Sequence, residues 1–410
     1  MNVNVNNARW FVIAISIGLS APAQSAAPDF QDFLTRACAN ALPNTDFFER
    51  CNVDSVDGDL SGDSEDSLNP TQPLSAGASA LAETRARIKA LQSKMQSEAD
   101  SSESDAAETF GISGLSFLAN IETGQQDRVL TASERGFETD SLRVMVGGDF
   151  RLQNNLLAGA IFTINRSETE FLADAPGRNF EPGPSEGAID RDAYSLNLFV
   201  TGLVGETGYA DAILSYSWST SDFSRIGVFQ ESTRTLPTQA VVTQSDIDGS
   251  QWSASAGIAW DLEVSQYQFQ PFMRATYQQN RTDPYTEAGG IGFGMQFDTK
   301  TFKESIVSAG FRFSRSFNMD WGILTPQLGA EYNLKGGDDR FSADTSFVED
   351  PQQLNFLVTG DALDDAYGRL FGSVSFGLPN GLTVFVNIED YFSQAFVDDS
   401  RITAGLRKEF

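Results

Sequence analysis

The sequence predicts an all-β protein, a 12-stranded antiparallel transmembrane β-barrel preceded by an α-helix and a short acidic N-terminal segment. The first observation is the stretch 402–410, where apolar side chains occupy alternate positions and an aromatic residue, Phe410, comes last. Strict alternation is typical of a strand with one apolar face. The second observation is that this alternation recurs about a dozen times back to residue 112, which is the pattern of a closed membrane barrel.

Residues 1–26 predict a secretory signal peptide, exported by the Sec translocon and cleaved at its end. Arg9 precedes the apolar run 10–19, and residues 24–26 resemble the small-residue cleavage site of such peptides. A transmembrane anchor is the alternative, but the run is shorter than the roughly 20 residues that a spanning helix needs. No other stretch has 18 consecutive apolar residues, so membrane insertion would use strands, as in the outer membrane of a Gram-negative bacterium.

The composition agrees with a barrel and excludes several functions. Hydrophobic residues make up only 40% of the chain and aromatic residues 11%, as expected when one face of each strand is apolar. The net charge of −28 argues against nucleic acid as a partner. The chain has no histidine, which excludes His-dependent triads, dyads and metal sites. We therefore predict no catalytic residue, no metal and no cofactor, and do not expect an enzyme.

Residues 27–76 form a short acidic exported segment that contains the only two cysteines, Cys38 and Cys51. In an oxidising compartment each has one possible partner, so we predict a disulfide. Two free thiols are the alternative. Closing this loop would stabilise the segment by about 3 kcal/mol in the chain-entropy model. The loop also holds a small apolar cluster, made of Leu42, Phe47 and Phe48.

Residues 54–76 have the composition of a linker. Residues 57–62 match the start of an EF-hand loop, but Leu68 stands where that loop needs a bidentate glutamate. A solvated acidic linker is therefore the better interpretation. Pro70 and Pro73 are expected to interrupt regular structure.

Residues 77–110 are predicted to contain an amphipathic helix over 79–99. Its apolar face carries Leu81, Ile88, Leu91 and Met95, and its basic residues are Arg85, Arg87, Lys89 and Lys94. Such a helix would be roughly 30 Å long, about the thickness of a bilayer core, and too polar to face lipid. It could pass through the polar lumen of a barrel, pairing with lumen carboxylates and packing on a glycine-lined wall. An exposed periplasmic helix or coiled coil is the alternative, and the pattern does not decide between them.

Residues 111–410 are predicted to form the barrel, with short turns on the periplasmic side and long loops outside. The strands are expected near 112–123, 138–152, 156–170, 190–204, 208–222, 249–264, 267–281, 303–317, 321–334, 365–378, 381–395 and 399–410. The long loops are expected near 124–137, 171–189, 223–248, 282–302 and 335–364. Because the strand count is even, both ends of the barrel should lie on the periplasmic side.

Charged residues within these strands should face the lumen, because a charge facing lipid at mid-depth costs about 2–4 kcal/mol. The lumen candidates are Arg143, Asp211, Arg274, Arg312, Glu331 and Glu389, together with Asp149, Arg151, Arg401 and Arg407. Aromatic residues near strand ends should form the interfacial girdles. These are Tyr194, Tyr216, Trp218, Tyr267, Tyr277, Tyr332 and Phe410.

The barrel region resembles that of the autotransporters, which belong to the type V secretion proteins. Residues 270–277 and 325–332 are similar to the family's strands that open with proline and close on an aromatic, and residues 208–216 to its mid-barrel strand. The C-terminal positions Ile402, Ala404, Leu406 and Phe410 resemble its closing strand and assembly signal. The resemblance implies an outer-membrane barrel, inserted in lipid by the barrel-assembly machinery, that translocates or displays its N-terminal segment. We expect a monomer.

The chain departs from the family pattern in two respects. Lys408 stands where an aromatic is usual, and no long repetitive passenger precedes the barrel. A porin-like or structural barrel with a periplasmic N-terminal segment is therefore the alternative function, in which lumen charges would set ion selectivity. An outer-membrane hydrolase with loop carboxylates, such as 338–339 or 364–365, is the third. Surface exposure of residues 27–76 would separate the first two.

Overall fold

The computed structural model describes residues 28–53, 67–100, 114–131, 134–153, 156–172, 187–205, 207–229 and 239–410. The predicted signal peptide, the EF-hand-like stretch 57–62 and the end of the predicted helical region, 101–110, lie outside the described residues.

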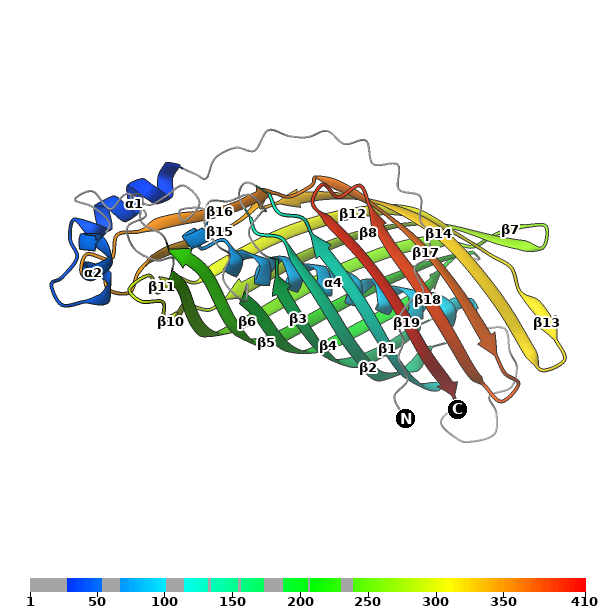
Figure 1. Cartoon of the computed structure of the whole chain (residues 1–410). Helices are drawn as coiled ribbons and strands as arrows, with labels where there is room; N and C mark the ends of the chain where they lie inside the picture. The colour runs from blue at the N-terminus through cyan, green and yellow to red at the C-terminus, as the bar shows by residue number, and fades with distance from the viewer. Residues whose placement is uncertain are drawn as a thin grey trace, which may run out of the picture.

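Twelve long antiparallel strands close into a barrel (Figure 1), as predicted. They are β1 (Leu115–Arg128), β2 (Phe137–Gln153), β3 (Leu156–Phe171), β4 (Gly187–Val204), β5 (Gly208–Phe229), β6 (Gln239–Trp260), β8 (Tyr267–Thr282), β12 (Lys300–Ser314), β14 (Gly322–Gly337), β17 (Ala366–Gly377), β18 (Leu382–Phe392) and β19 (Val397–Glu409). Each pairs with its neighbour along this series, and β1 pairs with β19 to close the ring.

Two of the predicted long loops contain ordered strands instead. These are β9 (Tyr285–Thr286), β10 (Ala288–Gly289), β11 (Met295–Phe297), β15 (Arg340–Phe347) and β16 (Phe356–Ala362). Four of them form a separate sheet in the order β16-β15-β11-β9, which we call the loop sheet. Much of the predicted loop 223–248 is also strand, because β5 and β6 pair along their whole length.

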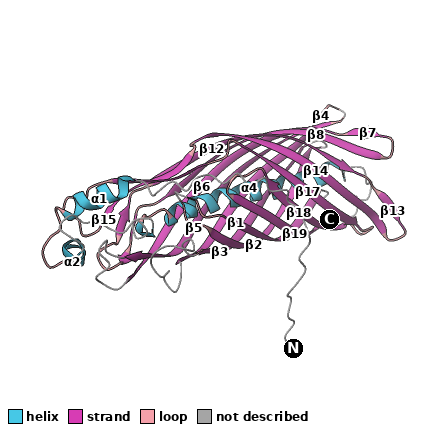
Figure 2. Ribbon diagram, turned by 45° about the horizontal axis from the view of Figure 1, so that its top comes forward, coloured by secondary structure: helices cyan, strands magenta, loops and turns pink. Residues whose placement is uncertain are grey.

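The two ends of the barrel differ (Figures 1 and 2). At one end lie the loop sheet and two short helices, α1 (Pro28–Cys38) and α2 (Asp46–Val53). At the other end lie the C-terminus and the short hairpins, which β7 (Leu262–Val264) and β13 (Phe317–Met319) lengthen. We call these the long-loop end and the short-turn end. This asymmetry is the one expected of outer-membrane barrels.

A third helix, α4 (Gln72–Asp100), runs through the inside of the barrel (Figures 1 and 2). With 29 residues, it is about 43 Å long. It begins seven residues before the predicted range 79–99, so the expectation that Pro73 interrupts regular structure was wrong. Proline is tolerated in a first helical turn, where its missing N–H has no partner to lose. None of the described helices is long and apolar enough to span a membrane.

Two rows of aromatic side chains mark the apolar belt on the outer wall. Towards the short-turn end, Tyr267 stacks on Phe313 at 4.9 Å between ring centroids. Towards the long-loop end, Tyr194 stacks on Trp218 at 6.1 Å, and Trp252 lies 5.0 Å from Tyr277. The second row lies inside its strands rather than at their ends, since the strands continue well beyond it. The barrel is therefore taller than the apolar layer that it spans.

Beyond this second row the outer wall becomes strongly acidic. Exposed carboxylates at successive cross-strand positions run from β2 to β6 and, one step further out, from β19 to β3. They are Asp140, Glu168, Asp190, Asp222 and Asp246 in the first series, and Asp398, Asp127, Glu138 and Glu170 in the second. We call these nine residues the acidic belt. Like charges directly opposite each other across strands are destabilising, so the belt is a local cost to the fold.

Candidate functional site

Side chains of α4 pair with charged groups on opposite walls of the lumen. Arg85 binds Glu304 of β12, with Nε–Oε2 at 3.1 Å. Lys89 pairs with Glu331 of β14. On the opposite wall Glu83 accepts a hydrogen bond from Arg191 of β4 at 2.8 Å. The helix is thus held through ion pairs on both sides. Arg85 and Lys89 pair with lumen carboxylates in the way that the sequence analysis predicts for the basic residues of this helix.

Two further hydrogen bonds and a hydrophobic contact add to these ion pairs. Arg143 Nη2 donates to the backbone carbonyl of Glu83 at 3.0 Å, and Ser167 Oγ donates to its carboxylate at 2.9 Å. Ile88 packs on large apolar side chains of β1 to β5, not on a glycine-lined wall as expected. These are Leu118, Met145, Ile161, Phe199 and Ile213. The side chains of Leu91, Lys94 and Met95 lie outside the described part of the molecule.

The structure places all six principal lumen candidates in the barrel interior. Arg143, Asp211, Arg274, Arg312, Glu331 and Glu389 are each buried. Arg274 pairs with Asp211, and Arg369 bridges Glu331 at 2.9 Å and Glu389 at 2.8 Å. Arg312 differs, because it lies over the rings of Phe272 and Phe371 instead.

Of the further candidates, three are buried and one is not. Asp149, Arg401 and Arg407 lie in the interior, whereas Arg151 is exposed at the end of β2. Glu122, Arg191 and Glu304 are further buried partners of this network and are absent from the predicted lumen residues. Each stands at an inward position of an alternating strand, so the period-2 pattern could have found them.

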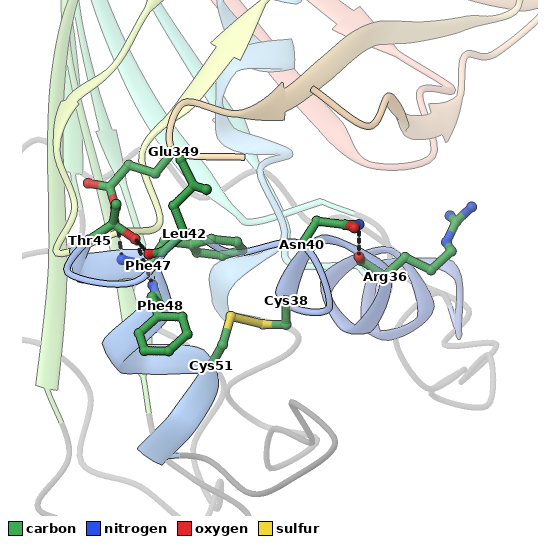
Figure 3. Close-up of a disulfide and its surroundings, with 9 residues drawn as sticks. All are labelled: Arg36, Cys38, Asn40, Leu42, Thr45, Phe47, Phe48, Cys51 and Glu349. Atoms are coloured by element: carbon green, nitrogen blue, oxygen red, sulfur yellow. Dashed lines mark hydrogen bonds between the residues drawn. A yellow bond between two sulfur atoms is a disulfide. The ribbon is translucent and has the colours of Figure 1, made fainter. Parts of the chain in front are cut away.

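A disulfide-closed pair of helices covers the long-loop end (Figure 3). Cys38 and Cys51 form the predicted disulfide, which joins α1 to α2. Phe33 of α1 stacks on Phe347 at 5.0 Å and on Phe356 at 4.9 Å, both from the loop sheet. We call residues 28–53 the cap. Its aromatic side chains and those of the loop sheet make one hydrophobic core.

The second helix of the cap is anchored at its first turn (Figure 3). Phe47 lies 4.8 Å from Phe347, and its N–H donates to the carboxylate of Glu349 at 2.9 Å. Thr45 caps the helix, with its Oγ1 accepting from the N–H of Phe48 at 3.1 Å. The predicted cluster of Leu42, Phe47 and Phe48 is not formed, since Leu42 is 51% exposed. Phe47 instead packs on a partner about 300 residues away.

The chain entering α4 is fixed to the inner side of β5. Arg225 and Glu287 form a buried bidentate pair at 2.7 and 2.5 Å. Arg225 also donates to the carbonyl of Leu68, and Val228 N–H donates to Ser67 Oγ at 2.8 Å. Leu68, at the twelfth position of the EF-hand-like stretch, is therefore buried where the chain enters the long-loop end of the barrel.

One buried carboxyl group lies in the connection between β1 and β2. Glu134 Oε1 accepts from the N–H of Asp361 at 2.6 Å, and its other oxygen lies 3.2 Å from Arg128. Burial raises the pKa of Glu134 above its usual value, although the guanidinium of Arg128 opposes the shift. The acidic pairs considered for a hydrolase have structural contacts: Asp338 accepts from Lys303 N–H and Asp364 from Ala395 N–H.

The C-terminal strand closes the ring. Ile402, Ala404, Leu406 and Phe410 all lie on its exposed outer face, as the alternation predicts. Phe410 N–H donates to the carbonyl of Leu115 at 3.1 Å.

Comparison with known proteins identifies the family. Residues 117–389 match the model of the autotransporter beta-domain. The translocator domain of the autotransporter NalP from Neisseria meningitidis is similar in structure, with a TM-score of 0.54, 15% identity, and coverage of 79% of this chain and 98% of that one. The transport unit of AIDA-I from Escherichia coli has a TM-score of 0.49, 14% identity, and coverage of 75% and 93%.

The beta domain of the Bordetella autotransporter Brka has a TM-score of 0.49, 12% identity, and coverage of 72% of this chain and 100% of that one. No curated protein sequence matches the chain. The family model spans well over half of the 410 residues. The chain therefore belongs to the autotransporter beta-domain family and is an outer-membrane transport barrel of that type.

Proposed function

We propose that this barrel translocates its own short N-terminal segment and keeps it on the cell surface as a cap over the outer mouth. The role is transport and display, without catalysis. The observation that carries the proposal is the stacking of Phe33 on Phe347 and Phe356 at the long-loop end. In barrels of this kind the long loops face outward, so the cap lies outside.

The course of the chain supports the same direction. The cap precedes α4, which enters the lumen beside β5, and β1 begins at the short-turn end. A chain that follows this path crosses the membrane layer once inside the barrel. A 12-stranded barrel has room for a helix in its lumen, whereas an eight-stranded one is filled by its side chains.

The porin-like alternative requires the N-terminal segment to be periplasmic. The burial of Phe30, Phe33 and Phe47 in one core with the loop sheet argues against that placement. The ion pairs of Arg85 and Lys89 argue that the lumen is filled rather than open. Surface display and the porin-like function would share the same export steps. For either function, the signal peptide 1–26 is removed after Sec export, and the C-terminal strand directs insertion of a monomeric barrel by the assembly machinery.

An epitope tag tests the topology. Inserted before Pro28, it should be detected by antibody on intact cells. The control is the same tag at Asn380, in a short turn at the opposite end, which should be reached only after the outer membrane is permeabilised. Detection of the Pro28 tag only after permeabilisation would refute surface display and favour the porin-like barrel.

A further inference from the structure

A crevice at the outer mouth lies between α4 and the side of the barrel formed by β14, β17, β18, β19 and β1. Its volume is about 50 Å³. One water needs roughly 10–15 Å³, so the space suits a single small group of about three to five heavy atoms. Arg85, Arg128, Lys335 and Tyr367 contribute to its lining. We call this space the outer crevice.

Two of its three cations are already neutralised. Arg85 binds Glu304, and Arg128 lies 2.6 Å from Asp361 and 3.2 Å from Glu134. Lys335 forms no ion pair with any residue that the structure describes, and its ammonium lies 5.8 Å above the ring of Tyr367. It is the cation that remains for a ligand.

A hydrogen-bond donor lies beside it. Tyr367 is 2% exposed, and its hydroxyl has no hydrogen-bond partner among the described residues. A buried hydroxyl without a partner is costly. Of the two carboxylates of the lining, Asp364 accepts from Ala395 N–H and Asp399 accepts from Arg401 through Oδ2, whereas Asp399 Oδ1 has no partner among the described residues. An ammonium beside an unused hydroxyl suits a negatively charged oxygen group.

The height of the crevice indicates where such a group comes from. Tyr332, Gly368 and Phe392 are cross-strand partners on β14, β17 and β18. The two aromatic side chains face outward, 55% and 43% exposed, and mark the membrane interface on this side. Tyr367 is the next residue along β17 and faces inward. The outer crevice therefore lies at the level of the lipid headgroups.

We propose that the outer crevice binds one phosphate-type oxyanion, with Lys335 as its counter-charge and Tyr367 as a hydrogen-bond donor. The group is either free phosphate or the phosphate of a lipid headgroup. The acidic belt runs along the outer face of the wall from β19 to β6 and would repel the same group there. It adjoins the crevice at β19 and β1, where Asp398 and Asp127 face outward. Binding in detergent does not depend on the direction of the barrel, so this inference stands apart from surface display.

The test uses the full-length protein in detergent, with thermal unfolding followed at increasing inorganic phosphate and constant ionic strength. Phosphate should raise the unfolding temperature of the wild type and of Lys303→Gln, a control at an exposed lysine near the same end. In Lys335→Gln the apparent affinity should fall about tenfold, as when a charge-assisted hydrogen bond is lost. Tyr367→Phe should weaken it several-fold, and Lys335→Arg should retain it.

A second arm identifies the source. The protein in nanodiscs is supplied with phosphatidic acid or with phosphatidylcholine, and retained lipid is counted by native mass spectrometry. Retention of phosphatidic acid that depends on Lys335, without an effect of free phosphate, assigns the site to a lipid phosphate. An effect of free phosphate alone assigns it to the soluble anion. The proposal is wrong if neither the phosphate-dependent unfolding temperature nor the retention of phosphatidic acid differs between the wild type and Lys335→Gln. Folding of Lys335→Arg is the condition for drawing that conclusion.

Discussion

A few charged residues in the lumen form the ion pairs that bind α4 to the barrel wall. Glu331 accepts from both Lys89 and Arg369, and all three side chains are buried. Removing Glu331 would leave Lys89 buried without its carboxylate, while Arg369 would keep Glu389. Breaking a buried pair in this way costs more than the pair itself contributes.

We predict that Glu331→Gln lowers the free energy of unfolding by about 3–5 kcal/mol, because Lys89 loses its carboxylate. Urea unfolding in detergent micelles measures this. The matched control is Asp192→Asn, which breaks the exposed pair with Arg166 and should change stability by about 0–1 kcal/mol. Equal effects of the two variants would contradict the buried network.

Glu134 gives a prediction about pH. Burial raises its folded-state pKa above the unfolded value, so the folded protein binds this proton more tightly. The associated stability is present at low pH and is lost as pH rises from the ordinary carboxyl pKa through the raised one. Unfolding temperatures of the wild type should fall across that window relative to those of Glu134→Gln. A constant difference between the two proteins would count against the shift.

At the scale of elements, the membrane-embedded strands could be predicted and the parts outside the membrane could not. Alternation around Trp252 identified β6 because its outer face meets lipid. Beyond the aromatic row that face is polar, as at Asp222, so the alternation weakens and the sequence predicts loop where the strands in fact continue. Phe347 and Phe356 bury themselves against α1, a partner that local pattern does not reveal.

The lumen residues illustrate the same limit. A charge in an alternating strand must turn inward, so the position of Arg274 or Glu389 follows from sequence. Which groups pair does not, because pairing depends on cross-strand register and on the height of α4 in the lumen. Pro73 misled the placement of the helix start, since a proline in a first turn and a proline that ends regular structure look alike in sequence.

Docking of the cap depends on its aromatic core. Phe33→Ala should weaken the docking of the cap on the loop sheet by about 3–5 kcal/mol, the usual cost of truncating a buried phenylalanine. Hydrogen exchange should then accelerate in residues 28–38 and in β15 together. The control Leu42→Ala, at an exposed position of the same segment, should leave both unchanged. Acceleration confined to the cap would mean that the loop sheet does not depend on it.

Removal of the helix tests the filled lumen. Deleting residues 79–99 takes away Arg85, Ile88 and Lys89 with their wall contacts. Single-channel conductance in planar bilayers should rise. A double variant with Asp192→Asn and Leu42→Ala keeps the helix and should conduct as poorly as the wild type. Equal conductance with and without the segment would mean that α4 does not block the pore.

At the scale of the whole molecule, the net charge of −28 is unevenly placed. Nine of the 56 acidic residues form the acidic belt, where carboxylates such as Asp190, Asp222 and Asp246 are direct neighbours. Repulsion between exposed charges is screened by salt, with a Debye length of about 30 Å at 0.01 M and about 3 Å at 1 M.

We therefore predict that added salt raises the unfolding temperature and that Asp222→Asn stabilises the protein by roughly 0.2–1 kcal/mol at low salt. The gain should disappear at high salt. Asp32→Asn, at an exposed position on α1 away from the belt, is the control and should have little effect. A gain that persists at high salt would point to packing instead of charge.

The shared core of cap and loop sheet also limits how this chain can change. Phe33 and Phe47 are separated by about 300 residues from Phe347 and Phe356, yet they form one hydrophobic unit. A foreign cargo grafted in place of residues 28–53 would leave the aromatic face of the loop sheet bare in water. Substitutions on one side would need matching substitutions on the other. The loop sheet is thus fitted to one segment, and the barrel would be a poor general scaffold for engineered display.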